Sequence, residues 1–366
     1  MFISLFLSFS VVFAQPQQEP PEERSPLDMT RALGISFLQE SGLEEEFNKS
    51  AIRGMLQYLD EQIGFGTSQL MSVQQKDAVL QYQNGIREGY GLRVQLIERK
   101  GFLIEHVFED GAAYTSGLRK GDLIISIGAQ SLMAKRSKEM VDILNQPPKD
   151  QIRFEVLREG HLVSFGVSRG AYFLQPISVY ENVVQIHYFG PKTAEMLAEI
   201  LRQKKDEPLI LDLRNNDGGS IEEVQKVMGL FATNVVMGYR HFVDGSQEEI
   251  RSVSAYKDVC ETPIYILTNN QTTQAAELFV AAMQFHQRAL VVGEKTAGIS
   301  SENHFYPLNE LLFLYVADVQ LWSPGKLPWE GVGLEPSIVV RSSQSIASGK
   351  SIDVQLETVL RLIKTP

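Results

Sequence analysis

The sequence predicts a multidomain protein of α+β and α/β class, and three observations support this prediction. The chain has 366 residues, enough for two or three domains at about 100–200 residues each. Residues 82–169 contain short stretches of alternating hydrophobicity, separated by turns that contain glycine, as in small β domains. After Gly170, apolar strand-like segments alternate with helical segments, a pattern typical of an α/β layer with parallel strands.

The residues at the N-terminus predict that the protein is exported. Residues 1–14 form an apolar run that ends in Val12-Phe13-Ala14, the small-residue pattern of a signal peptide, and the run is too short to cross a bilayer core of about 30 Å. Residues 15–28 are rich in Gln, Glu and Pro and predict a disordered linker. No later segment is apolar enough for a transmembrane span. We therefore expect an exported, periplasmic or extracytoplasmic protein; the alternative is that the run is retained as an interfacial anchor.

The remaining elements follow in order. Residues 29–81 predict an N-terminal helical segment, because apolar residues such as Ile52, Met55 and Leu56 recur at helical spacing. Within 82–170 we expect strands at 92–97, 104–107, 121–127 and 152–157, a short helix at 112–118 and a longer one at 137–144. Within 171–366 we expect strands at 183–188, 209–213 and 264–268, helices at 191–203, 221–231 and 274–286, and a C-terminal helix at 351–363.

Composition and charge exclude several classes of function. Hydrophobic residues make up 43% and charged residues 22% of the chain, so it can bury a core and is not wholly disordered. The formal net charge is −11, the wrong sign for a protein that neutralises phosphates, so we expect no nucleic-acid partner. Cys260 is the single cysteine, and the six histidines lack metal-ligand spacing. We therefore predict no disulfide, no metal and no cofactor.

A glycine-containing turn opens the first strand of the middle region. In Gly89-Tyr90-Gly91-Leu92, consecutive backbone N–H groups can remain unpaired and hold the terminal carboxylate of a peptide. Together with the segment GLRKGDLIISIG and the helix at 137–144, residues 82–170 resemble a PDZ domain. The resemblance implies that a peptide adds as a strand beside Leu92, with side chains selected by the helix that carries Met140 and Leu144. The alternative is a small barrel without an open groove.

Motifs in the rest of the chain extend the resemblance to a second family. AIRGML, LILDLRNNDGG, LTNNQTTQAAEL, VVGEKTAG and GVGLEP occur in the order found in the C-terminal processing (tail-specific) peptidases, over residues 29–363. This resemblance implies a ClpP/crotonase-like α/β core over residues 171–366. It also implies a serine peptidase with a Ser-Lys dyad and an oxyanion hole made of backbone amides.

The residues at the family's catalytic positions differ from the family pattern. Asp217 replaces a usual proline, while Gly218 and Gly219 remain as an oxyanion scaffold. When the motifs are superimposed, the nucleophile position falls on Ala276, the lysine position on Ile299 and the third polar position on Asn303. A methyl group cannot attack a carbonyl and isoleucine cannot accept a proton. We therefore expect a catalytically degenerate member, a pseudoprotease that binds protein C-termini or extended chains.

Two alternatives remain open. One is an active serine endopeptidase that cleaves near protein C-termini with a relocated nucleophile, in which Lys295 acts as the base, or His304 with Glu302 activates Ser300 or Ser301. The other is a regulatory partner that forms a homodimer, or a heteromer with an active relative, through its N-terminal helical segment.

Overall fold

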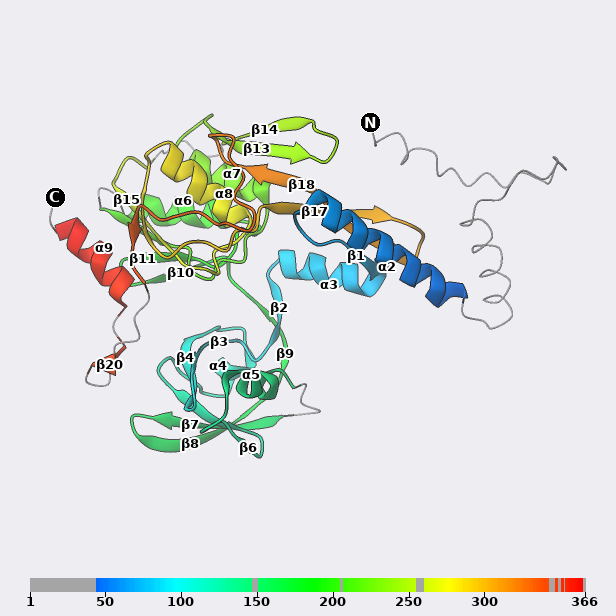
Figure 1. The fold of residues 1–366 in the computed structure, drawn as a ribbon. Helices are drawn as coiled ribbons and strands as arrows, with labels where there is room; N and C mark the ends of the chain where they lie inside the picture. Colours follow the sequence, from blue (N-terminus) through cyan, green and yellow to red (C-terminus); the bar gives the residue numbers. More distant parts are fainter. Residues whose placement is uncertain are drawn as a thin grey trace, which may run out of the picture.

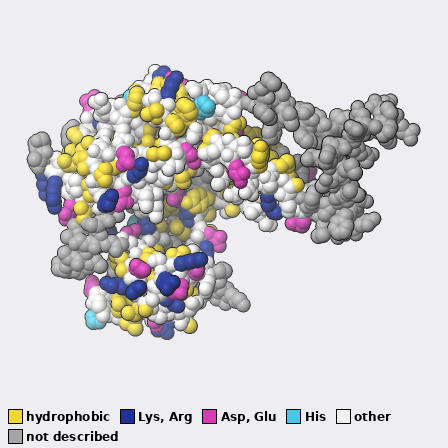
Figure 2. Space-filling model, in the orientation of Figure 1, with side chains coloured by type: hydrophobic (Ala, Val, Ile, Leu, Met, Phe, Trp, Pro, Cys, Tyr) yellow, Lys and Arg dark blue, Asp and Glu magenta, His cyan; other side chains and the backbone are white. Residues whose placement is uncertain are grey.

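The computed structural model describes residues 44–146, 151–204, 207–254, 260–341, 346–347, 350–351 and 353–364. The predicted signal peptide and linker, residues 1–14 and 15–28, lie outside this part of the chain. The described residues form an α/β core, an N-terminal helical unit beside it and a PDZ-like unit below it (Figure 1). A space-filling view shows a recess between the core and the PDZ-like unit (Figure 2). The predicted fold class is therefore confirmed.

Residues 29–43 of the predicted helical segment lie outside the described part of the chain. From residue 44 on, the structure has two helices, which fit that prediction, and one strand, which the sequence did not predict. Helix α2 (Glu44–Ile63) is followed by strand β1 (Gln69–Ser72) and helix α3 (Val73–Gln83). Helix α3 begins with a capping box, in which the side chains of Ser72 and Gln75 each accept a hydrogen bond from the other residue's backbone N–H. Strand β1 pairs antiparallel with β18 (Leu312–Trp322), so the unit is joined to the core by a sheet.

The PDZ-like unit is a small β structure whose sheet has β3 at one edge and β8 at the other. Its sheet has the order β3-β4-β5-β7-β8, and β6 pairs with β5. Helices α4 and α5 pack with this sheet around a core that includes Ile104, Met140 and Phe154. The elements are β3 (Leu92–Ile97), β4 (Gly101–Val107), α4 (Ala112–Thr115), β5 (Leu123–Ile127), β6 (Gln130–Ser131), α5 (Ser137–Asn145), β7 (Ile152–Arg158) and β8 (His161–Val167).

A two-stranded ribbon joins the PDZ-like unit to the core. Strand β2 (Ile86–Gly89) leads into the unit and pairs antiparallel with β9 (Gly170–Phe173), which leads out of it. Figure 1 shows these two strands as the covalent link between the two bodies. Gly85 precedes the ribbon with a φ of +87°, and a Cβ there would collide with the Tyr188 side chain, so the close approach requires glycine.

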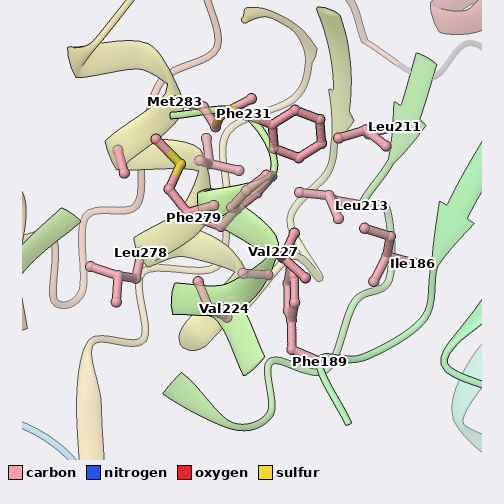
Figure 3. Close-up of a cluster of buried hydrophobic side chains, with 14 of the residues drawn as sticks. Ile186, Phe189, Leu211, Leu213, Val224, Val227, Phe231, Leu278, Phe279 and Met283 are labelled. Atoms are coloured by element: carbon pink, nitrogen blue, oxygen red, sulfur yellow. The ribbon is translucent and has the colours of Figure 1, made fainter. Parts of the chain in front are cut away.

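The α/β core is a six-stranded sheet covered on both faces. Its strands have the order β10-β11-β12-β15-β16-β19, and neighbours from β11 to β19 are parallel. Helices α6, α7 and α8 pack on one face, where Phe189, Phe231 and Phe279 meet (Figure 3). Helix α9 packs on the other face through Val359. The elements are β10 (Ile177–Tyr180), β11 (Val183–Ile186), α6 (Thr193–Gln203), β12 (Leu209–Asp212), α7 (Ile221–Gly229), β15 (Ile264–Thr268), α8 (Ala275–Phe285), β16 (Leu290–Gly293), β19 (Ile338–Val339) and α9 (Val354–Lys364).

A second sheet flanks the core. It has the order β1-β18-β13-β14, and β17 also pairs with β18. Its further strands are β13 (Val236–Phe242), β14 (Gln247–Arg251) and β17 (Ser301–Pro307), while β20 (Ile346–Ala347) and β21 (Lys350–Ser351) form a separate pair. Across the described part of the chain, no helix is both long and apolar enough to cross a membrane.

Candidate functional site

The turn after β12 carries the predicted oxyanion scaffold. Gly218 and Gly219 have φ values of +84° and +124°, a conformation that glycine adopts at low cost. The buried side chain of Asn216 organises the turn, because its Nδ2 donates to the Ile186 carbonyl (2.8 Å) and its Oδ1 accepts from the Gly218 amide (2.9 Å). The Gly218 amide is thus already paired within its own turn, whereas Gly219 is exposed. One of the two amides of the predicted scaffold is therefore occupied.

Gln274 lies against this turn at the start of α8. Its φ of 48° and ψ of −116° are sparsely populated by residues other than glycine. A Cβ built on Gly218 would lie 2.9 Å from the Gln274 Cβ and 3.1 Å from its Oε1, so the two residues are in direct contact. A strained residue between a strand and a helix is the geometry that presents a nucleophile in other hydrolases. At this position the chain presents a carboxamide.

The structure does not bring Ala276 to the site. Ala276 lies inside α8 with 0% of its surface exposed and packs in the apolar core with Phe279. A reacting group on this residue would be out of reach of any substrate. The sequence-based prediction of Ala276 as the nucleophile position is therefore corrected to Gln274, which contacts Gly218.

The buried carboxylate of Glu277 ties the two candidate segments together. Its Oε2 accepts from the amides of Gln274 (3.0 Å) and Ile299 (2.9 Å), which makes these two residues neighbours. Its Oε1 accepts from the Thr296 hydroxyl (2.5 Å) and the Gly298 amide (2.8 Å). Burial raises the pKa of Glu277, and these four donors oppose that shift. The carboxylate therefore holds the loop of the predicted base position against the start of α8.

The predicted base position carries an apolar and partly exposed side chain. Ile299 exposes 38% of its surface, and its amide rather than its side chain contacts the Glu277 carboxylate. Asn303, the predicted third polar position, lies in β17, and its Nδ2 donates to the Thr67 carbonyl (2.8 Å). Asn303 thus connects β17 to the N-terminal unit.

The residues considered for a relocated active site occupy structural positions. Ser300 is fully buried, and its hydroxyl donates to the Glu330 carboxylate (2.8 Å). Lys295 is partly exposed and pairs with Glu335 (3.0 Å) at the surface. His304 Nδ1 donates to the Asp318 carboxylate (2.7 Å) on the flanking sheet. Ser301 is buried, and its Cβ lies near Gly66. These contacts show that each residue either packs inside the fold or forms an ion pair or hydrogen bond at its surface.

The structure places the residues of the predicted peptide site along one edge of the PDZ-like unit and in its core. Strand β3 lies at one edge of the sheet, as strand addition requires. The turn of Gly89, Tyr90, Gly91 and Leu92 leads into it, and Tyr90 is buried with its ring edge against Phe154. Leu144 is half-buried. The prediction that Met140 contacts the peptide is corrected, because its side chain is fully buried in the core of the unit and offers no surface to a ligand.

Asp217, the residue in place of the usual proline, contacts the link to the PDZ-like unit. The Tyr82 hydroxyl donates to its Oδ2 (2.7 Å), and the Arg87 guanidinium lies 3.5 Å from the same atom. Burial and this carboxylate raise the pKa of Tyr82, so its hydroxyl stays protonated and donates. The sequence indicated the replacement at Asp217, but the partners on α3 and β2 were visible only in the structure.

Comparison with known proteins agrees with this architecture. Residues 182–340 match the model of peptidase family S41, and residues 79–157 match that of the PDZ domain. The carboxy-terminal processing protease CtpB of Bacillus subtilis is 23% identical over 92% of this chain and 72% of its own length. The carboxyl-terminal-processing protease of Synechocystis is 24% identical over 86% of this chain and 76% of its own.

A solved structure shows the same fold. The photosystem II D1 C-terminal processing protease superimposes with a TM-score of 0.53 at 18% identity, over 87% of this chain and 86% of that one. The two family matches and the long alignments thus cover the core, the PDZ-like unit and the segment that joins them. The chain thus carries a segment of peptidase family S41 and a PDZ domain, and over most of its length it is similar to carboxy-terminal processing proteases.

Proposed function

We propose that this chain is a non-catalytic member of its family that binds protein C-termini or extended chains. The observation that supports this proposal is the identity of two neighbouring residues. Gln274, at the strained turn against Gly218, has no nucleophilic atom, and Ile299 beside it has no group that accepts a proton. Loss of the nucleophile in comparable hydrolases lowers the rate by about a million-fold.

The binding activity rests on the edge strand β3. A peptide that pairs with this edge gains backbone hydrogen bonds along Leu92–Ile97, and the amides of the preceding glycine turn are suited to a terminal carboxylate. The names of the relatives given above describe them as carboxyl-terminal processing proteases. We propose that this chain binds the same class of ligand, protein C-termini. We further propose that residues 1–14 direct export, so that binding takes place in the periplasm or another extracytoplasmic space.

Catalysis is tested with an activity-based probe and a substrate. The purified chain is treated with a fluorophosphonate and, separately, with an unstructured protein that ends in small apolar residues; the Bacillus subtilis relative serves as the positive control. We expect neither labelling nor cleavage. A fluorophosphonate adduct mapped by mass spectrometry to Ser300 or Ser301 would establish the alternative of a relocated nucleophile.

Binding is tested with matched peptides. Peptides of one sequence with a free or an amidated C-terminus are titrated by fluorescence anisotropy. The free form should bind more tightly, because amidation removes the negative charge that the glycine turn receives. Equal affinities would contradict recognition of the terminal carboxylate.

Exposed apolar residues on α2 favour a second candidate function, regulation through association. Met55 and Tyr58 expose 60% and 61% of their surfaces on this N-terminal helix. A homodimer, or a heteromer with an active relative, would cover them. Sedimentation of the wild type against Met55→Asp tests self-association, and co-purification from the native envelope tests the heteromer. A monomer that retrieves no catalytic relative would remove this candidate.

A further inference from the structure

Arg93 leaves the edge strand β3 on the side that faces the α/β core. Leu92, Val94 and Leu96 pack against the core of the PDZ-like unit, so the alternating residue Arg93 points the other way. The extra residue in this strand pair belongs to β4, where Arg93 pairs with His106 and Val94 with Ile104, and β3 therefore keeps its alternation. The guanidinium reaches the α/β core, where its Nη2 lies 3.0 Å from His187 Nδ1.

The partner of Arg93 carries no charge. Arginine is always a donor, so His187 Nδ1 accepts and His187 Nε2 donates to the Ser178 hydroxyl (2.9 Å), which is the arrangement of a neutral imidazole. Burial and the neighbouring cation lower the pKa of His187 well below its ordinary value and that of His106 to about 4. Both rings are therefore neutral at pH 7.

No carboxylate compensates Arg93 at short range. Among the described residues, no acidic oxygen lies within 4.0 Å of its guanidinium. Asp212, Glu105 and Asp217 act on Arg93 only from farther away. Asp212 and Asp217 are each engaged by another donor, Arg214 and Tyr82 respectively. Burial lowers the pKa of Arg93, which indicates that water solvates this cation poorly. A desolvated cation whose hydrogen-bond partner is neutral gains from an incoming anion.

The position of Arg93 defines which anion it can meet. A peptide strand added beside β3 directs every second side chain to the face that carries Arg93, and the others to the opposite face. In the proposed complex, the turn that ends at Leu92 binds the terminal carboxylate of the peptide. The peptide group that reaches Arg93 is therefore a side chain. We infer that Arg93 selects ligands that carry Asp or Glu at alternate positions on the face of the added strand that looks toward the core. The inference rests on the proposed binding function and names its ligand class.

The test uses the full chain and a set of peptides with a free C-terminus. Glutamate is placed at each of the last six positions in turn, with glutamine at the same position as the neutral match. We expect glutamate to bind about tenfold more tightly than glutamine at alternate positions, because a charge-assisted hydrogen bond replaces a neutral one. The intervening positions should show no difference. The Arg93→Gln variant should lose this gain, and Arg93→Lys should keep part of it.

An arginine elsewhere on the same unit provides the control. Arg153 lies on β7, away from the β3 edge, and its side chain is exposed, so Arg153→Gln should bind all peptides like the wild type. Equal binding of glutamate and glutamine by the wild type at every position would overturn the inference, as would a gain that survives Arg93→Gln. If amidation has no effect while the glutamate gain remains, recognition of the terminal carboxylate fails alone. If no peptide binds, both proposals fail.

Discussion

The buried carboxylate of Glu277 should be indispensable to the stability of the core. In the Glu277→Gln variant the side chain keeps its shape, and its one remaining oxygen can still accept from Thr296 and Gly298. The new NH₂ group then faces the amides of Gln274 and Ile299, two donors that lose their acceptor. Each buried donor left unpaired costs about 1–3 kcal/mol, and the relief of burying a neutral group offsets part of this. We expect the free energy of unfolding to fall by about 2–4 kcal/mol.

Tryptophan fluorescence measures this effect in the right domain. Trp322 and Trp329 are the only tryptophans in the chain, and both lie outside the PDZ-like unit, so their emission follows the unfolding of the core and its flanking sheet. For a domain of this size the melting temperature should fall by about 4–16 °C. Glu335→Gln removes a carboxylate at the surface and should change stability by less than about 0.5 kcal/mol. An equally small change in Glu277→Gln would refute the role assigned to this residue.

Three further outcomes follow from the same geometry. Gln274→Ser with Ile299→Lys should react with a fluorophosphonate above the wild-type level, whereas Ala276→Ser with Ile299→Lys should not, because position 276 is buried; the opposite order would restore the sequence-based placement. Gln274→Gly should stabilise the core by about 1 kcal/mol in thermal unfolding, since glycine adopts its φ of 48° without strain, and a loss would show that the side chain stabilises the turn. The pKa of His106 is lowered to about 4 by burial, so the folded state disfavours its protonation and the unfolding free energy should decrease as pH falls from about 6.5 to about 4. In denaturation experiments at a series of pH values, His106→Gln should flatten this slope. An unchanged slope would contradict the burial of this ring.

Local patterns predicted the α/β core better than the flanking sheet. The alternation of strands and helices after Gly170 is visible because each strand is a short apolar run between amphipathic helices. Strand β1 was missed within a segment expected to be helical. It has only four residues, Gln69–Ser72, without alternation, and its partner β18 lies near the other end of the chain. Its strand conformation depends on this long-range pairing rather than on local propensity.

Sequence motifs located both segments of the candidate site but not the residue that faces Gly218. Several small residues precede Glu277, and the motif alone did not decide which of them leaves the helix. One signal was present: Gln274 and Glu277 have the spacing of an N-cap and its third helical residue, and the structure shows their reciprocal capping box. That spacing places residue 274 outside the helix and residue 276 inside it. The positive φ of Gln274 has no counterpart in the sequence.

Different residues of the candidate site hold the backbone in place and occupy the catalytic positions. This explains how the catalytic side chains can be absent while the backbone of the site keeps its shape. Asn216 holds the glycine turn to the sheet, and Glu277 holds the loop of Ile299 to α8, so both are needed for the fold. The side chains at positions 274 and 299 make neither of these two connections, because Gln274 and Ile299 reach the Glu277 carboxylate through their backbone amides and the Gln274 side chain only caps the start of α8. A carboxamide and an isoleucine can therefore stand at these positions with little effect on the backbone of the site. An isoleucine at position 299 also avoids the cost of holding an ammonium group where no partner hydroxyl exists.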